Sequence, residues 1–287
     1  MGLPYGDSGG CVVRVLSWDD FIGSRRLKSS ELAMTIGVFD GVHYGHQRLI
    51  QQVISQPVEI HGVLTFRYNP RRFLKPHLFP GDITSGRQKL NILSSLGIDT
   101  IILIDFSNDF SKLSGNEFIT KIRQSCDLRY LALGDNFRCG YQGRSSAYDL
   151  RDILAASKIP VEIVPPVSYN GGTLSSTRIR AAIREGELER TSEMMGRKFV
   201  LDIAGIPQRH EDSRASIEKT GLSQVLPPVG RYKVNVHTSN RSFFSDVLID
   251  QECLRWKQSG EDEAVYIEFL SNDLSDGKAN KIDETNI

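Results

Sequence analysis

Two histidines stand three residues apart where an apolar run gives way to an amphipathic one. Residues 35–46 read Thr-Ile-Gly-Val-Phe-Asp-Gly-Val-His-Tyr-Gly-His. Glycines at a strand-to-helix turn let a phosphate approach the backbone, and a helix N-terminus offers free N–H groups and the positive end of its dipole. His43 and His46 can therefore face the same anion and share its charge. For a displacement at phosphorus, donors placed where charge accumulates are the main catalytic device.

Two other interpretations of the histidine pair are open. A histidine at a helix start is often a cap or a surface residue, and the pattern His-x-Gly-His arises by chance in roughly one such chain in a hundred. Its position between a strand and a helix favours the phosphate interpretation. A zinc site would need a third ligand, and no other His or Cys has a telling spacing.

A second polar segment, residues 171–180, reads Gly-Gly-Thr-Leu-Ser-Ser-Thr-Arg-Ile-Arg and leads into a helical pattern. Helix capping alone would explain one hydroxyl here. It would not require Ser176 and Thr177 as well as Ser175, followed by Arg178 and Arg180. Arginine beside free N–H groups suits the β- and γ-phosphates of a nucleotide. Together, the two segments supply cations for one polyphosphate.

The elements that must position these segments alternate along the first two thirds of the chain. Short β-rich apolar runs predict strands at residues 32–39, 58–66, 100–106, 129–133 and 161–164. Amphipathic stretches between them predict helices at residues 46–54, 87–96, 116–123 and 146–156. This alternation predicts an α/β fold, a Rossmann-like doubly wound parallel sheet that binds ligands at the carboxyl ends of its strands.

The pattern changes near residue 200. Two helices are expected at 176–184 and 188–194, and the polar stretch 207–221 is expected to be a linker or mobile loop. Three later runs alternate as strands do and predict a small β-rich domain or incomplete barrel, at residues 231–237, 242–249 and 264–270. We therefore expect a first domain at 1–200, a β domain at 201–270 and a disordered tail at 271–287.

Composition narrows the possible partners. The 287 residues include 35 Lys and Arg against 35 Asp and Glu, so no net charge attracts nucleic acid or anionic lipid. The longest apolar stretch, residues 100–106, is far shorter than the ~18 residues that span a bilayer. The four cysteines are scattered, and the N-terminus does not resemble a signal peptide. We expect a soluble, cytoplasmic protein that binds neither nucleic acid nor membrane.

At the two phosphate segments the sequence resembles the nucleotidyltransferase superfamily with the HxGH and ISSTxxR signatures. More narrowly, it is similar to the prokaryotic FAD synthetase (FMN adenylyltransferase) family, whose GxFDGxHxGH pattern matches residues 37–46. Residues 133–140, Leu-Gly-Asp-Asn-Phe-Arg-Cys-Gly, resemble that family's GxxFxFG loop, which touches flavin and adenine. The resemblance covers about residues 12–200.

The resemblance implies an enzyme that transfers AMP from Mg²⁺-bound ATP to FMN, giving FAD and pyrophosphate. The residues that it implies for catalysis are His43, His46 and Arg180. Those that it implies for binding ATP are Gly37, Phe39, Asp40, Gly45, Ser176, Thr177 and Arg180. Those that it implies for binding flavin are Asn69, Asn136, Phe137 and Arg138, and no residue is expected to be a dedicated metal ligand.

The sequence departs from the family at two places. Where the family reads TFxPHP, this chain has Asn69 in place of the histidine, and a basic cluster at 67–75 is an alternative phosphate contact. In the second half, residues 226–236 and 264–270 resemble a riboflavin kinase module. That module's PTAN element and catalytic Glu have no counterpart in residues 205–214 and 245–251. We therefore expect a degenerate kinase domain.

Two alternative functions are open at this point. The chain could be a bifunctional riboflavin kinase and FMN adenylyltransferase whose second site is unrecognised. It could also be a non-catalytic flavin carrier or sensor, which the change at Asn69 favours. The polyphosphate residues His43, His46, Ser176 and Arg180 argue against a carrier, because a carrier has no use for them.

Overall fold

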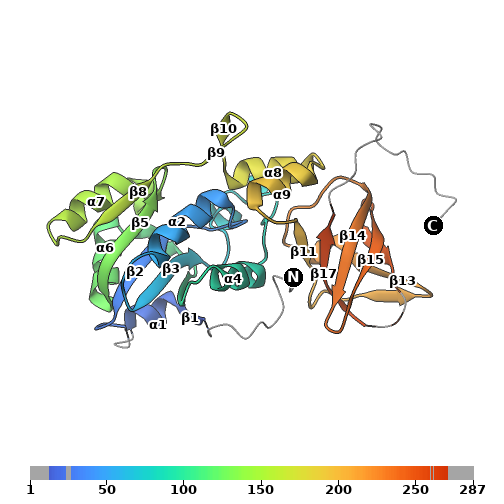
Figure 1. Cartoon of the computed structure of the whole chain (residues 1–287), viewed down its shortest axis with the longest axis horizontal. Coiled ribbons are helices and arrows are strands. Elements are labelled where there is room, and N and C mark those ends of the chain that lie inside the picture. The colour runs from blue at the N-terminus through green and yellow to red at the C-terminus, as the bar shows by residue number, and fades with distance from the viewer. Residues whose placement is uncertain (1–12, 24–26, 259, 261, 271–287) are drawn as a thin grey trace. The chain divides into compact units, whose positions relative to one another are not determined.

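The computed structural model describes residues 13–23, 27–258, 260 and 262–270. The chain forms two compact units, shown in Figure 1. Of the described residues, the first unit contains those up to Phe79 together with Gly86–Leu174, and the second contains Pro80–Ser85 and those from Ser175 onward. The expected boundary at residue 200 differs from this division. The predicted tail at 271–287 lies outside the described residues.

The first unit contains a six-stranded parallel sheet of order β1-β4-β3-β2-β5-β8. Its strands are β1 Arg14–Ser17, β2 Glu31–Ile36, β3 Ile60–Phe66, β4 Thr100–Ile104, β5 Asp127–Gly134 and β8 Val161–Val164. From β2 at the centre, the chain proceeds outward through β3 and β4, and later continues on the other side through β5 and β8. The prediction of a doubly wound α/β sheet is confirmed.

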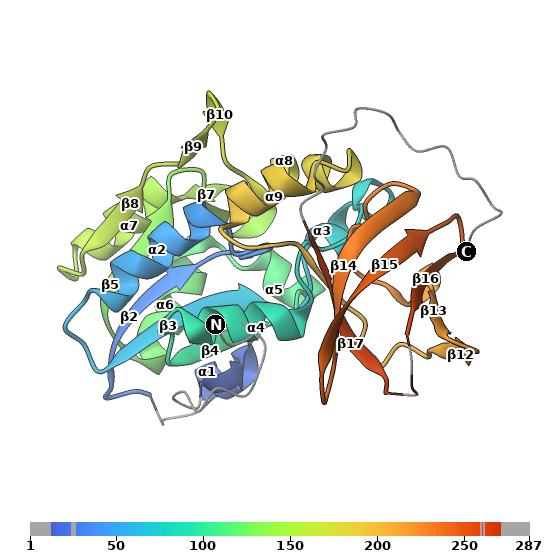
Figure 2. The ribbon, with the colours of Figure 1, turned by 45° about the vertical axis from the view of Figure 1, so that its right-hand side comes forward.

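Helices cover both faces of this sheet, as Figure 2 shows for α2, α4 and α6. The helices on one face are α1 Trp18–Gly23, α6 Gly115–Ser125 and α7 Ala147–Ala155, and those on the other are α2 Tyr44–Ile54 and α4 Gly86–Ser95. Neighbouring strand residues alternate between the two cores: Leu64 packs on the first face and Val63 on the second. A parallel sheet buried on both faces explains the continuous apolar runs of its strands.

The remaining elements of the first unit are short and lie in the connections. They are α3 Arg71–Leu74, η1 Pro76–Leu78, α5 Asn108–Lys112, β6 Arg138–Cys139, η2 Tyr141–Gly143, β7 Ser145–Ser146, β9 Ser168–Tyr169 and β10 Gly172–Thr173. Several of them follow the carboxyl ends of the central strands, where a doubly wound sheet binds its ligands.

The second unit contains helices α8 Ser176–Arg184 and α9 Leu188–Met195, and an antiparallel sheet of order β11-β17-β14-β15-β16-β13-β12. The strands are β11 Val200–Asp202, β12 Arg209–Glu211, β13 Arg214–Glu218, β14 Gly230–Thr238, β15 Ser242–Ile249, β16 Cys253–Lys257 and β17 Ala264–Phe269, with η3 at Lys219–Gly221. The prediction of a small β-rich domain is confirmed.

The prediction of a linker at residues 207–221 was wrong, because this stretch contains β12, β13 and η3. All three residues of β12 are exposed, so the hairpin lacks the apolar alternation that marks a strand. In β13, Ala215 and Ile217 alternate toward the core, and this strand pairs with β16, which the sequence pattern did not predict.

The core of the second unit comes from alternate residues of its long strands. Val234 and Val236 of β14 are fully buried, and their register partners in β17 are Phe269 and Ile267. Trp256 of β16 is also buried, with 1% of its surface exposed. This period of two is that of a sheet with one face toward a core.

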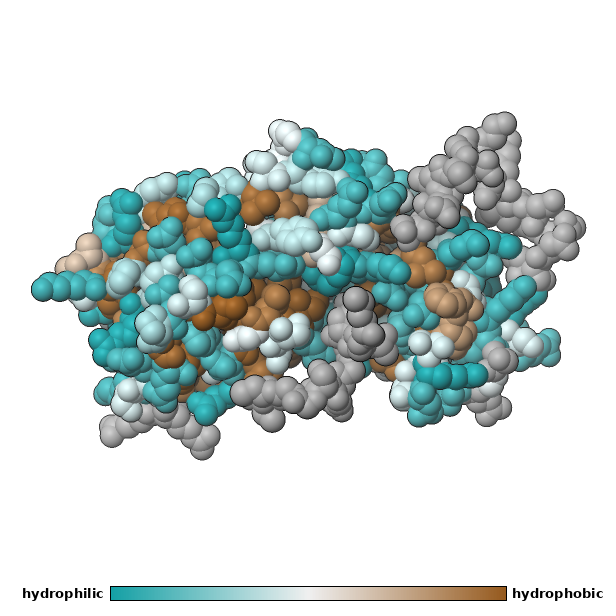
Figure 3. All heavy atoms as spheres, in the orientation of Figure 1, coloured by the Kyte–Doolittle hydropathy of each residue, from teal (hydrophilic) through white to brown (hydrophobic). Residues whose placement is uncertain are grey.

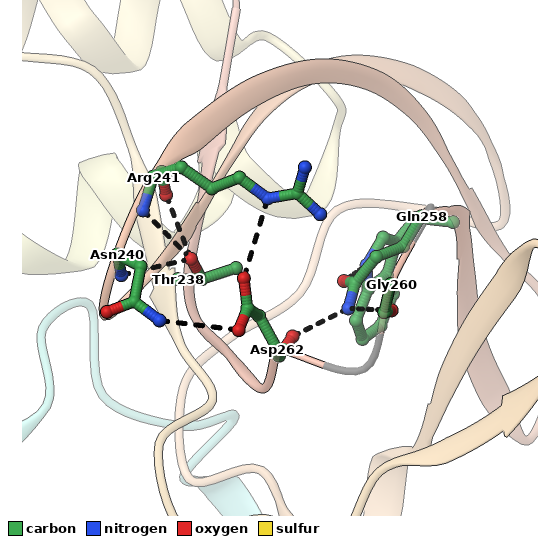
Figure 4. Close-up of polar contacts among 7 residues, drawn as sticks. Thr238, Asn240, Arg241, Gln258, Gly260 and Asp262 are labelled. Carbon is green, nitrogen blue, oxygen red and sulfur yellow. Dashed lines mark hydrogen bonds and ion pairs between the residues drawn. The ribbon is translucent and has the colours of Figure 1, made fainter.

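A polar network secures the short turn between β14 and β15 (Figure 4). The hydroxyl oxygen of Thr238 accepts hydrogen bonds from the backbone N–H groups of Asn240 and Arg241. Both side chains also reach Asp262, at 3.3 Å from the amide of Asn240 and at 3.6 Å from Nε of Arg241. The buried Gln258 donates to the Asp262 carbonyl. These bonds fix the conformation of the hairpin.

The face of the molecule seen in Figure 3 is mainly hydrophilic, with apolar residues in patches between polar ones. Within the described part of the chain, every helix is too short or too polar to cross a membrane.

Candidate active site

The turn between β2 and α2 carries the predicted histidines in an unusual backbone conformation. Phe39 and Val42 have positive φ angles of 52° and 34°, and Gly41 has a φ of 81°. Positive φ is rare for a side chain such as Val, so the surrounding structure must hold this turn in place. Because of this turn, β2 ends at Ile36, whereas the sequence predicted a strand that extends to residue 39.

The imidazole rings of His43 and His46 are stacked, with centroids 3.8 Å apart and planes 16° apart. His43 is the N-cap of α2 and is 5% exposed. The ring of the fully buried Phe39 lies 5.1 Å from that of His46, while the neighbouring Asp40 is 5% exposed. The two histidines therefore form a compact pair at a helix N-terminus, where an anion is favoured.

Gly37 and Gly45, which were predicted to contact ATP, each lie against the ring of a neighbouring residue. A Cβ atom on Gly37 would lie 3.1 Å from the ring of Phe39, and one on Gly45 would lie 3.1 Å from Cε1 of His43. A side chain at either position would require the neighbouring ring to shift by a few tenths of an ångström.

An apolar cavity of about 480 Å³ opens at the carboxyl edge of the sheet. Its walls come from the ends of β2, β3 and β4 and from the segments that follow these strands and β5. They include Ile36, Val38, Phe66, Pro70, Leu74, Ile104, Phe106, Phe110, Ser111, Leu113, Phe118 and residues 137–143. Val38 belongs to the same turn as the histidine pair. The volume and the apolar walls are typical of a small-molecule site.

The residues predicted to bind flavin are placed differently with respect to this cavity. Phe137 and Arg138 line it, whereas Asn136 is exposed and is outside its walls. Next to them, burial raises the pKa of Cys139 to about 12, and the charge of Asp149 adds to this effect. The thiol of Cys139 is thus a neutral part of the wall at physiological pH.

Asn69 directly precedes a residue of the cavity wall, and its side chain binds the backbone at the start of α3. It is 6% exposed, and its Oδ1 accepts a hydrogen bond of 3.1 Å from the backbone N–H of Arg71, at the start of α3. The following residue, Pro70, lines the cavity instead. In the basic cluster beside it, Arg67 is paired with Asp105 at 2.8 Å.

The second phosphate segment belongs to the other compact unit. Ser175 caps α8 by accepting a hydrogen bond from the N–H of Arg178, so Ser176 and Thr177 form the first turn. Arg180 is 5% exposed, and its Nε donates to the carbonyl of Gly81 at 2.9 Å. The sequence did not suggest this contact, because Gly81 is 99 residues away along the chain.

Most of the cavity wall was also missed by sequence reasoning. The sequence pattern places Phe106 at the end of a strand and predicts no role for Phe110, yet both line the cavity with ring centroids 6.3 Å apart. Aromatic residues after several strands of one parallel sheet were the available signal, because the carboxyl ends of such strands share one edge.

Among the described residues, no group of three or more His, Cys, Asp or Glu could hold a metal ion.

A doubly wound sheet with a glycine turn and a helix N-terminus at its carboxyl edge defines a nucleotide-binding α/β protein, here with the paired histidines of the nucleotidyltransferase fold. The model of one family, FAD synthetase, matches residues 26–178. The chain belongs to the FAD synthetase family.

Individual relatives agree with this assignment. The FAD synthetase of Listeria monocytogenes is 33% identical over 224 residues, which cover 75% of this chain and 87% of that protein. The bifunctional riboflavin kinase/FMN adenylyltransferase of Buchnera aphidicola from Acyrthosiphon pisum is 31% identical, and the match covers 60% of this chain and 56% of the relative's length. The bifunctional riboflavin kinase/FMN adenylyltransferase of Bacillus subtilis is 27% identical, and the match covers 75% of this chain and 71% of that protein.

A solved structure described as the macrolide-efflux protein of Streptococcus pneumoniae is similar to the present fold. It has a TM-score of 0.78 at 22% identity, and the match covers 96% of this chain and 94% of the other. This likeness concerns the fold alone.

Proposed function

We propose that this protein is an FMN adenylyltransferase. The observation that carries the proposal is that the turn at residues 37–43 contributes Val38 to an apolar cavity and holds the stacked pair His43 and His46. A flat apolar ring system in the cavity would place its phosphate-bearing chain near an anion site on the same turn. The family and the relatives named FAD synthetase support FMN as the acceptor.

In the proposed reaction, a phosphate oxygen of FMN attacks the α-phosphorus of ATP. The bond from that phosphorus to its bridging oxygen breaks, and pyrophosphate leaves with the electron pair. His43, His46 and the N-terminus of α2 would hold the α- and β-phosphates, with His46 stabilising the developing charge. Ser176, Thr177 and Arg180 would hold the departing phosphates. Positioning and electrostatics suffice, and no covalent enzyme intermediate forms.

ATP would enter as its Mg²⁺ complex, in which the ion binds phosphate oxygens and reduces their repulsion. In the apolar cavity, Phe137 and Arg138 would contact the flavin. Asn136 would contact the ligand from the exposed part of the same loop, and Asn69 would act by fixing the start of α3.

We also propose that the second unit lacks riboflavin kinase activity. Of the acidic residues that could replace a missing base, Asp250 is already bound: it accepts from the backbone N–H groups of Glu252 and Cys253 and pairs with Arg255.

The test is to incubate the purified protein with Mg-ATP and either FMN or riboflavin, and to separate the flavins by chromatography. FAD formed from FMN, with no FMN or FAD formed from riboflavin, is the expected result. Product from both substrates would mean that the second unit is an active kinase. A protein that retains bound flavin but forms no product would be a carrier, and the proposal of an enzyme would be overturned.

A further inference from the structure

A lysine is buried inside the first unit, behind the histidine turn. Lys89 lies on α4 and is 6% exposed. Burying an ammonium group is costly unless it is hydrogen-bonded, and this group has three donors to satisfy. Its Nζ lies 2.6 Å from the carbonyl of Phe66, 3.4 Å from the hydroxyl of Thr65 and 3.5 Å from the carbonyl of Val38.

These three acceptors lie at the ends of neighbouring strands. Thr65 and Phe66 end β3, and Val38 follows β2. The hydroxyl of Thr65, itself fully buried, also donates to the carbonyl of Val38 at 3.0 Å. Lys89 and Thr65 thus form one network that ties the two strand ends together.

The network binds the strained turn near its beginning, at the carbonyl of Val38. Val38 directly precedes Phe39, the first residue of the turn with a positive φ, and the ring of Phe39 packs against that of His46. A strained backbone persists only where its surroundings hold it. The ammonium group of Lys89 is thus connected to the histidine pair through the backbone of the turn.

We propose that Lys89 is a positioning residue, which holds the turn at 37–43 so that His43 and His46 stay stacked where the phosphates react. This inference rests on the proposed function. A purely structural role would show as a loss of stability without a change at the two imidazole rings.

The test compares three variants with the wild-type protein. Lys89→Met keeps an unbranched side chain and removes the ammonium group, and Thr65→Val removes only the bridging hydroxyl. Ile122→Ala is the matched control, because Ile122 is fully buried on α6 in the core on the opposite face of the sheet. Each variant is measured for its melting temperature, for kcat and KM in FAD formation, and for the imidazole signals of ¹⁵N-histidine-labelled protein by NMR.

We expect Lys89→Met to lower kcat by about tenfold or more, with each KM within about threefold of the wild-type value, because misplacing a catalytic group affects turnover strongly. Thr65→Val should act in the same direction and less strongly. Both should shift or broaden the signals of His43 and His46, which single alanine variants assign among the six histidines. Ile122→Ala should lower the melting temperature and leave the signals and kcat of the folded protein unchanged.

Unchanged signals of His43 and His46 in both network variants would overturn the proposal whatever happens to turnover. The same losses in Ile122→Ala would also overturn it, since general destabilisation would then explain them. If Lys89→Met does not fold, Thr65→Val decides by the same criteria. The NMR measurement needs no substrate, so it tests this inference even if the protein forms no FAD.

Discussion

The rings of His43 and His46 are stacked face to face at 3.8 Å, and Gly45 leaves room beside the His43 ring. A Cβ atom at position 45 would lie 3.1 Å from Cε1 and 3.2 Å from Nδ1 of His43. The pattern His-x-Gly-His therefore has a steric basis in this chain. On the proposed function the two histidines provide the anion site, and the glycine between them leaves space for the ring of His43.

Replacing His46 should slow the chemical step. On the proposed function, His46→Ala is expected to lower kcat by about 10²-fold or more, because it removes a donor aimed at charge that develops in the transition state. Steady-state assays of FAD formation measure this. His210→Ala, an exposed histidine on β12, is the control and should retain full activity. Equal activity of the two variants would remove His46 from the catalytic residues.

Arg180→Lys should impair catalysis although the charge is kept. Lysine cannot reproduce the planar guanidinium fork, whose Nε donates to Gly81 and whose geometry matches two oxygens of one phosphate. We expect kcat/KM for ATP to fall by about tenfold or more. Arg184→Lys, an exposed position on the same helix, controls for the substitution itself. A full retention of kcat/KM in Arg180→Lys would contradict the phosphate role.

Filling the apolar cavity should weaken the binding of the flavin selectively. Ser111 lines the cavity, so Ser111→Phe adds a ring to its interior, whereas Lys112→Phe adds the same bulk at the next, exposed position of α5. We expect Ser111→Phe to raise KM for FMN by about tenfold, with KM for ATP little changed. Titration of FMN fluorescence gives the same comparison without turnover. Equal effects of both variants on FMN would place the flavin elsewhere.

Gly81 should tolerate no side chain. It has a φ of 118°, and a Cβ atom would lie 2.6 Å from the backbone nitrogen of Val225. Gly81→Ala is expected to reduce the free energy of unfolding by about 2 kcal/mol or more, since both backbone strain and a clash result. Gly86→Ala is the control, because a Cβ atom added there, at the start of α4, would have nothing within 4 Å. Urea unfolding curves compare the two variants.

The stability of the second unit should depend on the ionisation of Glu268. The side-chain hydrogen bond with the buried His237 is the largest of the interactions that lower the pKa of Glu268 from its ordinary value of about 4.5. The folded state then binds this proton less readily than the unfolded chain does. Its contribution to stability is present above about pH 4.5 and is lost as the pH falls through the lower folded pKa.

We therefore compare urea midpoints at about pH 5 and about pH 3, on either side of the ordinary pKa of a carboxyl group. Over this range, the midpoint of Glu268→Gln should fall less than that of the wild-type protein. Glu252→Gln, an exposed residue before β16, should follow the wild-type profile. Parallel profiles for all three proteins would show that the pair between His237 and Glu268 does not contribute.

The local sequence pattern was sufficient to predict the parallel sheet and its motifs. Apolar β-branched runs and amphipathic stretches sufficed for β2, β3, β4 and the helices between them, because burial on both faces leaves a continuous signal. The polar hairpin of β12 and β13 left no such signal, which is why the prediction of a linker at residues 207–221 was wrong.

By itself, the sequence determined the order of the elements, the glycine turn with its two histidines, and the likeness to the FAD synthetase family, since these depend on neighbours along the chain. Only the tertiary structure decided that Lys89 is buried among backbone carbonyls, that Asn69 fixes the start of α3, and that aromatic residues from separate strands enclose one cavity. In an amphipathic helical pattern, the sequence does not show whether a lysine is exposed or buried. The difference comes from long-range packing, which brings strand ends to one edge of the sheet.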